Sequence, residues 1–338
     1  MSERELATIR TIDSINPIEG ADAIEVATVN GWEVVVKKGE FTPGEDVVYL
    51  EIDSWVPHQL APFLSKGKEP REFENIKGER LRTVKLRGQV SQGLILPLTV
   101  LGEEYSDSNL TEFLGIVKWE KPLAANLAGV AKGNFPTHLF PKTDQNRVQN
   151  LSRQFPIKSH HGNFEITEKL DGSSMTVYLH DQTFGVCSRN LDLKETEGNS
   201  FWEVARKLDI ESKMLQHGDN LAIQGELVGS GVQGNKYKFP DGKRDFFVFN
   251  VYNIDEKRYL PPSECNTLVL NMGLNVVPVI DSYRDMSSTT IKDCVDMVNG
   301  IKSTINPNVQ AEGYVFKSNK SDLSFKAINN KWLLKYDE

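Results

Sequence analysis

The tetrapeptide Lys-Leu-Asp-Gly at residues 169–172 lies between two stretches of β-forming residues, 164–167 and 175–179. Asp-Gly is among the strongest turn signals, so this segment is predicted to connect two strands through a tight turn. A lysine beside such a turn also fits an ordinary solvated hairpin, and the turn alone leaves that interpretation open. What the turn does constrain is the fold, because it requires β-structure on both of its sides.

Three later segments place ionisable side chains inside apolar, strand-like runs. Glu226 lies near the end of one run, Glu312 opens a second, and Lys326 interrupts a third. Buried ionisable groups cost free energy unless they are paired or hydrogen-bonded. Each of them alone is weak evidence for a site. Together with the earlier Lys-x-Asp-Gly turn, they predict a nucleophilic lysine accompanied by acids and a second cation.

This set of motifs resembles the ATP-dependent polynucleotide ligases of the covalent nucleotidyltransferase superfamily, in particular nick-sealing RNA ligases with an N-terminal OB module. The resemblance covers nearly the whole chain. It implies that Lys169 attacks the α-phosphate of ATP and becomes lysyl-AMP, and that Lys326 is a second catalytic lysine. It also implies a set of nucleotide contacts: Arg147, Glu168, Lys169, Arg189, Glu226, Phe249, Glu312 and Lys326.

A nucleophilic lysine must first lose its proton. A free lysine has a pKa near 10.4, so forming its neutral amine at about pH 7.4 costs about 4 kcal/mol. A neighbouring Lys326 and a divalent metal would both lower this pKa, because each disfavours a second positive charge. Asp171, Glu226 and Glu312 are expected to hold Mg²⁺ or Mn²⁺, directly or through water, since hard cations prefer oxygen ligands.

The first part of the chain is predicted to be all-β. Two β-like runs flank Asn30-Gly31, which is a strong hairpin signal, and several further short strands with turns between them follow. Five or so such strands fit a small barrel, and the resemblance makes it an OB-fold that binds nucleic acid. We expect this module to span residues 1–115 and a linker to span residues 116–140.

The second part, residues 141–338, is predicted to be an α+β nucleotidyltransferase domain. Helices are expected near residues 145–153, 199–208, 263–272 and 291–301, and Ser200 is a plausible N-cap of the second. The Gly-rich segment 228–241 is predicted to be a loop beside Glu226, either a plain connection or a lid.

The distribution of charge along the chain bears on the partner that the protein binds. The net charge of −8 argues mildly against a nucleic-acid partner, but residues 66–87 carry eight basic and four acidic side chains. We expect this stretch to follow the phosphates of RNA.

Three widely spaced cysteines fit reduced thiols and give no zinc pattern. No apolar run reaches the length of a membrane span and the N-terminus is polar, so a cytoplasmic monomer without a membrane partner is expected.

The predicted reaction is the joining of 3′-OH and 5′-phosphate RNA ends at duplex nicks, through lysyl-AMP and an AppN-strand intermediate. A DNA ligase would use the same residues. RNA is favoured because the β-rich module precedes the catalytic domain, whereas in typical DNA ligases it follows. A non-catalytic RNA-binding protein is a third interpretation, against which stands the joint presence of Lys169, Glu226, Glu312 and Lys326.

Overall fold

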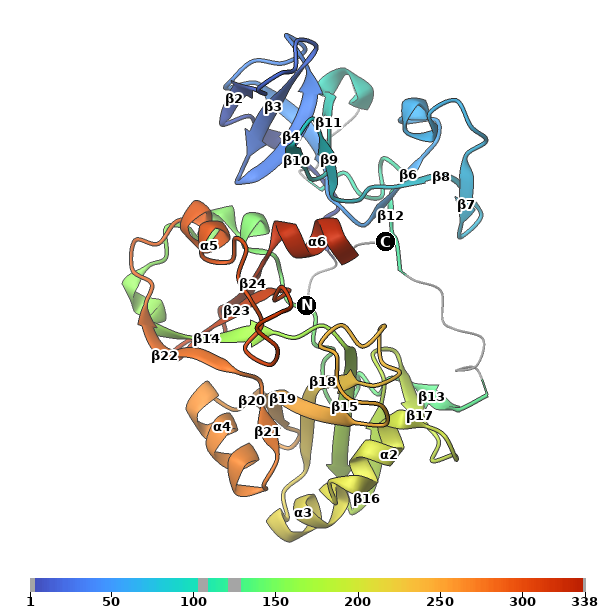
Figure 1. Cartoon of the computed structure of the whole chain (residues 1–338), viewed down its shortest axis with the longest axis vertical. Helices are drawn as coiled ribbons and strands as arrows, with labels where there is room; N and C mark the ends of the chain where they lie inside the picture. The colour runs from blue at the N-terminus through green and yellow to red at the C-terminus, as the bar shows by residue number, and fades with distance from the viewer. Residues whose placement is uncertain (1–3, 103–108, 121–128, 337–338) are drawn as a thin grey trace. The chain divides into compact units, whose positions relative to one another are not determined.

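The computed structural model of the protein describes residues 4–102, 109–120 and 129–336. The chain forms two compact units, one of residues 1–122 with 330–338 and one of residues 123–329 (Figure 1). Each unit has apolar clusters of its own, as expected for independent domains. Among the described residues no helix has both the length and the apolar character needed to cross a membrane.

The first unit consists mainly of short antiparallel strands. They pair in the orders β1-β5-β11, β2-β3-β4, β12-β6-β8-β7 and β9-β10. The strands are β1 (Ala7–Thr11), β2 (Ser14–Pro17), β3 (Ile24–Val29), β4 (Trp32–Lys37), β5 (Asp46–Leu50), β6 (Ser54–Pro57), β7 (Arg71–Phe73), β8 (Ile76–Arg80), β9 (Val84–Leu86), β10 (Gln89–Ser91), β11 (Leu94–Pro97) and β12 (Val117–Lys118). Helix α6 (Asn330–Tyr336) belongs to this unit, as do 3-10 helices at Pro62–Ser65 and Leu98–Leu101.

Strand β5 is buried on both of its faces. Val47 and Tyr49 belong to one apolar cluster, which also contains Trp32. Val48 and Leu50, on the opposite face, belong to a second cluster. Successive strand residues point to opposite faces, so a strand buried on both sides must be apolar throughout, as this one is after Asp46.

The hairpin predicted around Asn30-Gly31 is confirmed as β3 and β4. Val29 pairs with Trp32, which leaves a two-residue turn. Asn30 and Gly31 have φ values of 48° and 81°. Positive φ at both central residues is the conformation of a type I′ turn, whose twist matches that of the flanking strands.

The second unit contains two sheets. The larger has the order β13-β17-β16-β15-β18-β19-β20 with β21 on β19, and the smaller has the order β22-β14-β23-β24. The strands are β13 (Ala131–Asn134), β14 (Asn163–Lys169), β15 (Ser173–His180), β16 (Thr183–Cys187), β17 (Leu191–Leu193), β18 (Leu221–Gly229), β19 (Arg244–Asn253), β20 (Arg258–Tyr259), β21 (Asn275–Val276), β22 (Val279–Asp285), β23 (Gly313–Ser318) and β24 (Ser324–Ile328). The helices are α2 (Ser200–Lys207), α3 (Ile210–His217), α4 (Pro262–Asn271) and α5 (Ile291–Met297), with 3-10 helices at Val148–Asn150, Ser152–Gln154 and Ser159–His161.

The predicted α+β class is confirmed as this second unit, and three of its four predicted helices are confirmed as α2, α4 and α5. The helix predicted near residues 145–153 is wrong, because the chain there forms two short 3-10 helices, Val148–Asn150 and Ser152–Gln154. The predicted N-cap of α2 is wrong by one residue. Asn199, and not Ser200, accepts hydrogen bonds from the backbone N–H groups of Phe201 and Trp202. Both residue types cap helices well, so the sequence alone could not separate two adjacent candidates.

The predicted linker, residues 116–140, includes strands near both of its ends. β12 pairs with β6, and β13 pairs with β17. The middle of the linker, residues 121–128, lies outside the described residues. The limits of the linker and of the domains stay a prediction.

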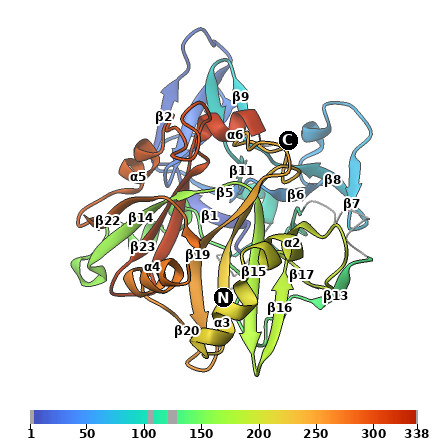
Figure 2. The same ribbon diagram turned by 60° about the horizontal axis from the view of Figure 1, so that its bottom comes forward.

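Residues 170–172 carry the chain from one sheet of the second unit to the other. β14 lies in the smaller sheet and ends at Lys169, and β15 lies in the larger sheet and begins at Ser173. Figures 1 and 2 show the two strands meeting where the sheets approach each other. The predicted turn is therefore not a hairpin within one sheet but a crossing between two, because β14 and β15 do not pair.

Candidate active site

The crossing turn is fixed by two acids that come from different sheets. Lys169 Nζ donates a hydrogen bond to Glu312 Oε2 at 2.7 Å. The Gly172 N–H donates to Glu226 Oε1 at 2.9 Å. The strand register explains both contacts. Lys169 pairs with Gly313, which follows Glu312, and Ser174 pairs with Glu226. The structure thus brings together three residues that the motifs predicted.

Position 172 requires glycine. A Cβ there would lie 2.2 Å from the carbonyl oxygen of Leu227. Real Cβ atoms do not approach a carbonyl oxygen that closely, so a larger residue would push the turn away from β18. The glycine of the Lys-x-Asp-Gly motif is therefore needed for packing as well as for the turn.

The charged neighbours of Lys169 determine the direction in which its pKa is shifted. Burial lowers the pKa of Lys169, but Glu312, Glu226 and Asp171 favour its charged form, and the net result is a raised pKa. Lys169 is therefore an ammonium paired with the Glu312 carboxylate. An amine in this form is not nucleophilic, because it carries a proton.

Two of the three acids beside Lys169 have raised pKa values. Burial, with a contribution from Glu312, raises the pKa of Asp171 to about 6. Burial raises the pKa of Glu226 to about 8, although Lys169 opposes that shift. A divalent cation that binds such carboxyl groups would displace their protons, because it relieves the repulsion between the carboxylates.

The chemistry of these oxygen donors fits Mg²⁺ or Mn²⁺, but direct ligation does not follow from their positions. Within residues 4–102, 109–120 and 129–336, no group of three or more His, Cys, Asp or Glu is arranged to hold a metal ion. Asp171 pairs with Lys236, and Glu312 with Lys169. A hydrated ion bound through its waters suits such a site, since Mg²⁺ dehydrates reluctantly. The metal role of Asp171, Glu226 and Glu312 stays a prediction.

Arg147 and Lys326 lie on neighbouring backbone segments. The two residues form a parallel β-bridge, and the Lys326 N–H donates to the Asn146 carbonyl at 2.9 Å. Lys326 pairs with Val315, which in turn pairs with Thr167, two residues before Lys169. Directly paired residues project from the same face of a sheet, so Lys326 shares the face of Lys169.

Glu168 is buried directly before the lysine. Its Oε2 accepts a hydrogen bond from the Thr304 N–H at 2.7 Å, and its own N–H donates to the Pro278 carbonyl. Its Oε1 has no hydrogen-bond partner among the residues that the structure describes. A buried carboxyl oxygen without a partner costs free energy, so this atom is suited to accept a hydrogen bond from a ligand.

Arg189 lies in the turn between β16 and β17 and is half exposed. Its guanidinium forms an ion pair with Asp144 at 3.0 Å. This contact joins Arg189 to the segment that contains Arg147, and not to the lysine turn. The nucleotide contact predicted for Arg189 stays a prediction.

Phe249 lies in β19 and packs against an apolar cluster that includes Leu170. Its carbonyl oxygen accepts a hydrogen bond from Lys317 Nζ, which also donates to Asn250 Oδ1 at 2.7 Å. Lys317 was not among the site residues predicted from the sequence. The signal was available, because Lys317 interrupts the same apolar run that Glu312 opens.

Lys317 also faces a buried acid, Glu165, its partner in the strand register. Burial lowers the pKa of Lys317 and raises the pKa of Glu165, so the protein interior disfavours the charged form of each. Glu165 Oε2 accepts a hydrogen bond from Asn266 at 2.6 Å. These contacts connect the strand of Phe249 to the smaller sheet.

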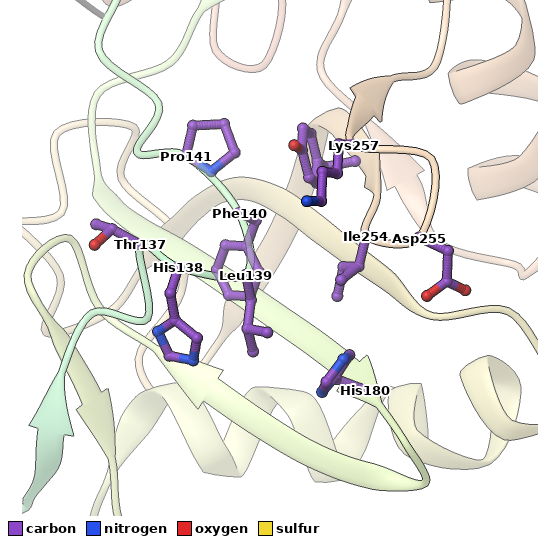
Figure 3. A pocket seen from close by; sticks show the side chains of 10 residues that line it. Thr137, His138, Leu139, Phe140, Pro141, His180, Ile254, Asp255 and Lys257 are labelled. Atoms are coloured by element: carbon purple, nitrogen blue, oxygen red, sulfur yellow. The ribbon is translucent and has the colours of Figure 1, made fainter.

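A hollow of about 510 Å³ lies at the far end of β15 from the lysine turn. Figure 3 shows the side chains of His138, Leu139 and His180 along it, with Lys257 near its upper edge. None of the predicted site residues lines it. The acids around Lys169 lie elsewhere, and the lysine turn is the candidate site.

The comparisons with known proteins identify the family of the chain. A family profile described as RNA ligase matches residues 162–330, and one described as an OB-fold domain matches residues 6–98. The chain belongs to the RNA ligase family. Its first unit carries the predicted OB-fold, which is thereby confirmed.

Solved RNA ligases from Naegleria gruberi are similar to this RNA ligase over the whole chain. A variant with AMP and Mn has 44% identity and a TM-score of 0.88, with 99% of each chain covered. A variant with ATP and Mn has 44% identity and a TM-score of 0.87, covering 98% of this chain and 99% of that one. A form with pyrophosphate has 44% identity, a TM-score of 0.87 and 99% coverage of each. A comparison with curated proteins gave no match.

The raised pKa of Glu165 predicts a pH-dependent stability. The folded protein holds this proton above pH 4.5 while the unfolded chain has released it, so the free energy of unfolding falls as the pH rises through that window. Glu165→Gln, which keeps an acceptor for Asn266, should gain stability relative to the wild type as the pH rises above 4.5. Melting curves followed by circular dichroism at three pH values measure the difference. Glu264→Gln, at an exposed position of α4, should show no such trend.

Proposed function

We propose that this RNA ligase uses ATP to join a 3′-OH end to a 5′-phosphate end at nicks in a duplex. The observation that carries the proposal is the position of Lys169, whose Nζ lies 2.7 Å from Glu312 in a turn bonded to Glu226. The relatives whose structures contain ATP or AMP with Mn, or pyrophosphate, support ATP as the nucleotide. Mg²⁺ or Mn²⁺ is the cation proposed to accompany it.

In the first step Lys169 Nζ loses a proton and attacks the α-phosphate of ATP. A P–N bond forms, the bond from the α-phosphorus to the bridging oxygen breaks, and pyrophosphate leaves. Glu312 Oε2 is positioned to accept the proton because it already receives a hydrogen bond from Nζ. The product is lysyl-AMP, a phosphoramide on the enzyme.

Positive charge near the phosphates stabilises the departing pyrophosphate. Arg147 and Lys326, joined by their backbone bridge, are proposed to supply it. A bound divalent metal would add charge stabilisation at the phosphate oxygens. Phe249 is proposed to stack on adenine, and Glu168 and Arg189 to contact the nucleotide.

The next two steps transfer AMP and seal the strand. An oxygen of the RNA 5′-phosphate attacks the phosphorus of lysyl-AMP, the P–N bond breaks, and Lys169 regains a proton. The 3′-OH then loses its proton and attacks the 5′-phosphorus of the AppN strand. A phosphodiester forms and AMP leaves, so each step makes one bond to phosphorus and breaks one.

The first unit is proposed to contact RNA through its β9–β10 hairpin. Ion pairs within the unit engage three cations of the basic stretch: Arg71 with Glu79, Lys77 with Glu69, and Arg80 with Asp53. On the hairpin, Lys85 and Arg87 are exposed beside the exposed apolar side chains of Val84 and Leu86. Basic and apolar groups together suit a phosphate backbone and its bases.

The cysteines bear on the compartment in which the protein is proposed to work. Three free cysteines, Cys187, Cys265 and Cys294, are all buried, which supports a reducing compartment such as the cytoplasm. A monomer is proposed, with a nucleic-acid module at residues 1–115 and a catalytic domain at residues 141–338.

Lys169→Ala should abolish the AMP adduct while leaving the fold intact, because the nucleophile is removed from a partly exposed position. The intact mass after incubation with ATP and Mg²⁺ or Mn²⁺ measures the adduct. Lys238→Ala, at an exposed lysine of a nearby loop, should form it normally. An adduct that persists in Lys169→Ala would mean that another residue is the nucleophile.

Sealing of matched nicks should distinguish an RNA ligase from a DNA ligase. We expect a nick with ribose at the 3′-OH end to be sealed about 10-fold faster, or more, than an all-DNA nick, since sites that bind a hydroxyl reject analogues that lack it. Single-turnover sealing of both substrates by the adenylylated enzyme measures the ratio. Equal rates would favour the DNA ligase alternative.

Replacing both Lys85 and Arg87 by alanine should weaken RNA binding and reduce its salt dependence. Each lost phosphate contact lowers the slope of log affinity against log salt by about 1. Fluorescence anisotropy with a nicked RNA duplex at several salt concentrations measures both quantities. Lys77→Ala serves as the control, because Lys77 is already paired with Glu69 at 2.9 Å. A control that weakens binding as much would contradict the hairpin assignment.

A further inference from the structure

The loop between β18 and β19, residues 230–243, forms its polar contacts with the lysine turn at Asp171. Lys236 Nζ forms an ion pair with Asp171 Oδ2. The Asp171 N–H donates a hydrogen bond to Tyr237 Oη at 2.8 Å. Two consecutive loop residues therefore hold both the side chain and the backbone of one turn residue, which itself lies between Lys169 and Gly172.

The loop is anchored, and does not merely extend over the turn. The Asn235 side chain donates to the Phe239 carbonyl at 2.8 Å and accepts from the Phe239 N–H at 2.9 Å. Asn306 Nδ2 donates to the Tyr237 carbonyl at 3.0 Å. Tyr237 is only 4% exposed and packs in one cluster with Leu170. The loop thus has a defined conformation before any ligand binds.

These contacts complete the set of restraints on the turn. Lys169 is fixed on one side by its strand pairing with Gly313, and Gly172 on the other side by Glu226. Asp171 lies between them and is held by Lys236 and Tyr237. Misplacement of a nucleophile by about 1 Å can reduce a rate about 100-fold, so a restraint on the turn bears directly on the first step.

We propose that Lys236 and Tyr237 are positioning residues that hold the Asp171 peptide so that Lys169 faces the α-phosphate of ATP. The inference rests on the proposed function, in which Lys169 is the nucleophile. Neither residue touches the reacting atoms; both act through Asp171. Their contribution should therefore appear in the formation of lysyl-AMP and not in the final sealing step, where Lys169 is no longer the nucleophile.

The experiment uses the full chain and four variants. Lys236→Met removes the ion pair, Lys236→Arg preserves it, and Tyr237→Phe removes the acceptor of the Asp171 N–H. Lys238→Met is the matched control, since Lys238 is an exposed lysine of the same loop. The single-turnover rate of lysyl-AMP formation and the KM for ATP are measured for each, together with the sealing of a pre-adenylylated RNA nick.

For Lys236→Met and Tyr237→Phe we expect adenylylation to slow by about 10-fold or more, with the KM for ATP within about 2-fold of the wild type. Sealing of the pre-adenylylated nick should stay near the wild-type rate. Lys236→Arg should recover most of the lost rate, and Lys238→Met should match the wild type. Amide hydrogen exchange should increase at residues 170–172 in the Met and Phe variants, and not in α2.

Other outcomes overturn the inference. Normal adenylylation in both Lys236→Met and Tyr237→Phe would show that the contacts have no positioning role. Slower sealing of the pre-adenylylated nick with a raised KM for RNA would make Lys236 a substrate-phosphate contact instead. A wild-type protein that forms no AMP adduct would contradict the proposed function, whereas an active wild type with unaffected variants would contradict only this inference.

Discussion

The crossing of the chain between two sheets at the lysine turn is the constraint on which the rest of the site depends. Because β14 and β15 belong to different sheets, the turn lies where side chains of both can reach it. Glu312 approaches from the smaller sheet and Glu226 from the larger. A hairpin within one sheet would have offered the lysine only one of these neighbours. The nucleophile and its acids meet because the two sheets meet.

The site combines a partly buried ammonium with three acids, and the balance of these charges sets their protonation. Isolated buried charges are costly, so Lys169 is paired with Glu312 and Asp171 with Lys236. Glu165 and Lys317 lie nearby in the same sheet, and burial opposes the charge on both. In this arrangement Lys169 is protonated, and Asp171 and Glu226 hold their protons more strongly than free carboxyl groups do.

Much of this arrangement could be predicted from local sequence. The Asn30-Gly31 hairpin and the helices α2, α4 and α5 follow from turn chemistry and periodicity, which act over a few residues. The N-cap of α2 could not be predicted in the same way, because Asn199 and Ser200 are adjacent and both residue types cap helices well. The contacts of Lys236 and Tyr237 were not predictable, because a Gly-rich loop has no periodic pattern from which its position could be read.

The sequence by itself determined which chemical groups the protein has and which segments become strands, because both are encoded locally. Lys169, Glu226, Glu312 and Lys326 could be chosen from their motifs without coordinates. Only the tertiary structure decided which of them touch, since Lys169 and Glu312 are 143 residues apart and meet through the register of β14 with β23. It also decided that the resting lysine is charged, because a pKa depends on the neighbours that folding supplies.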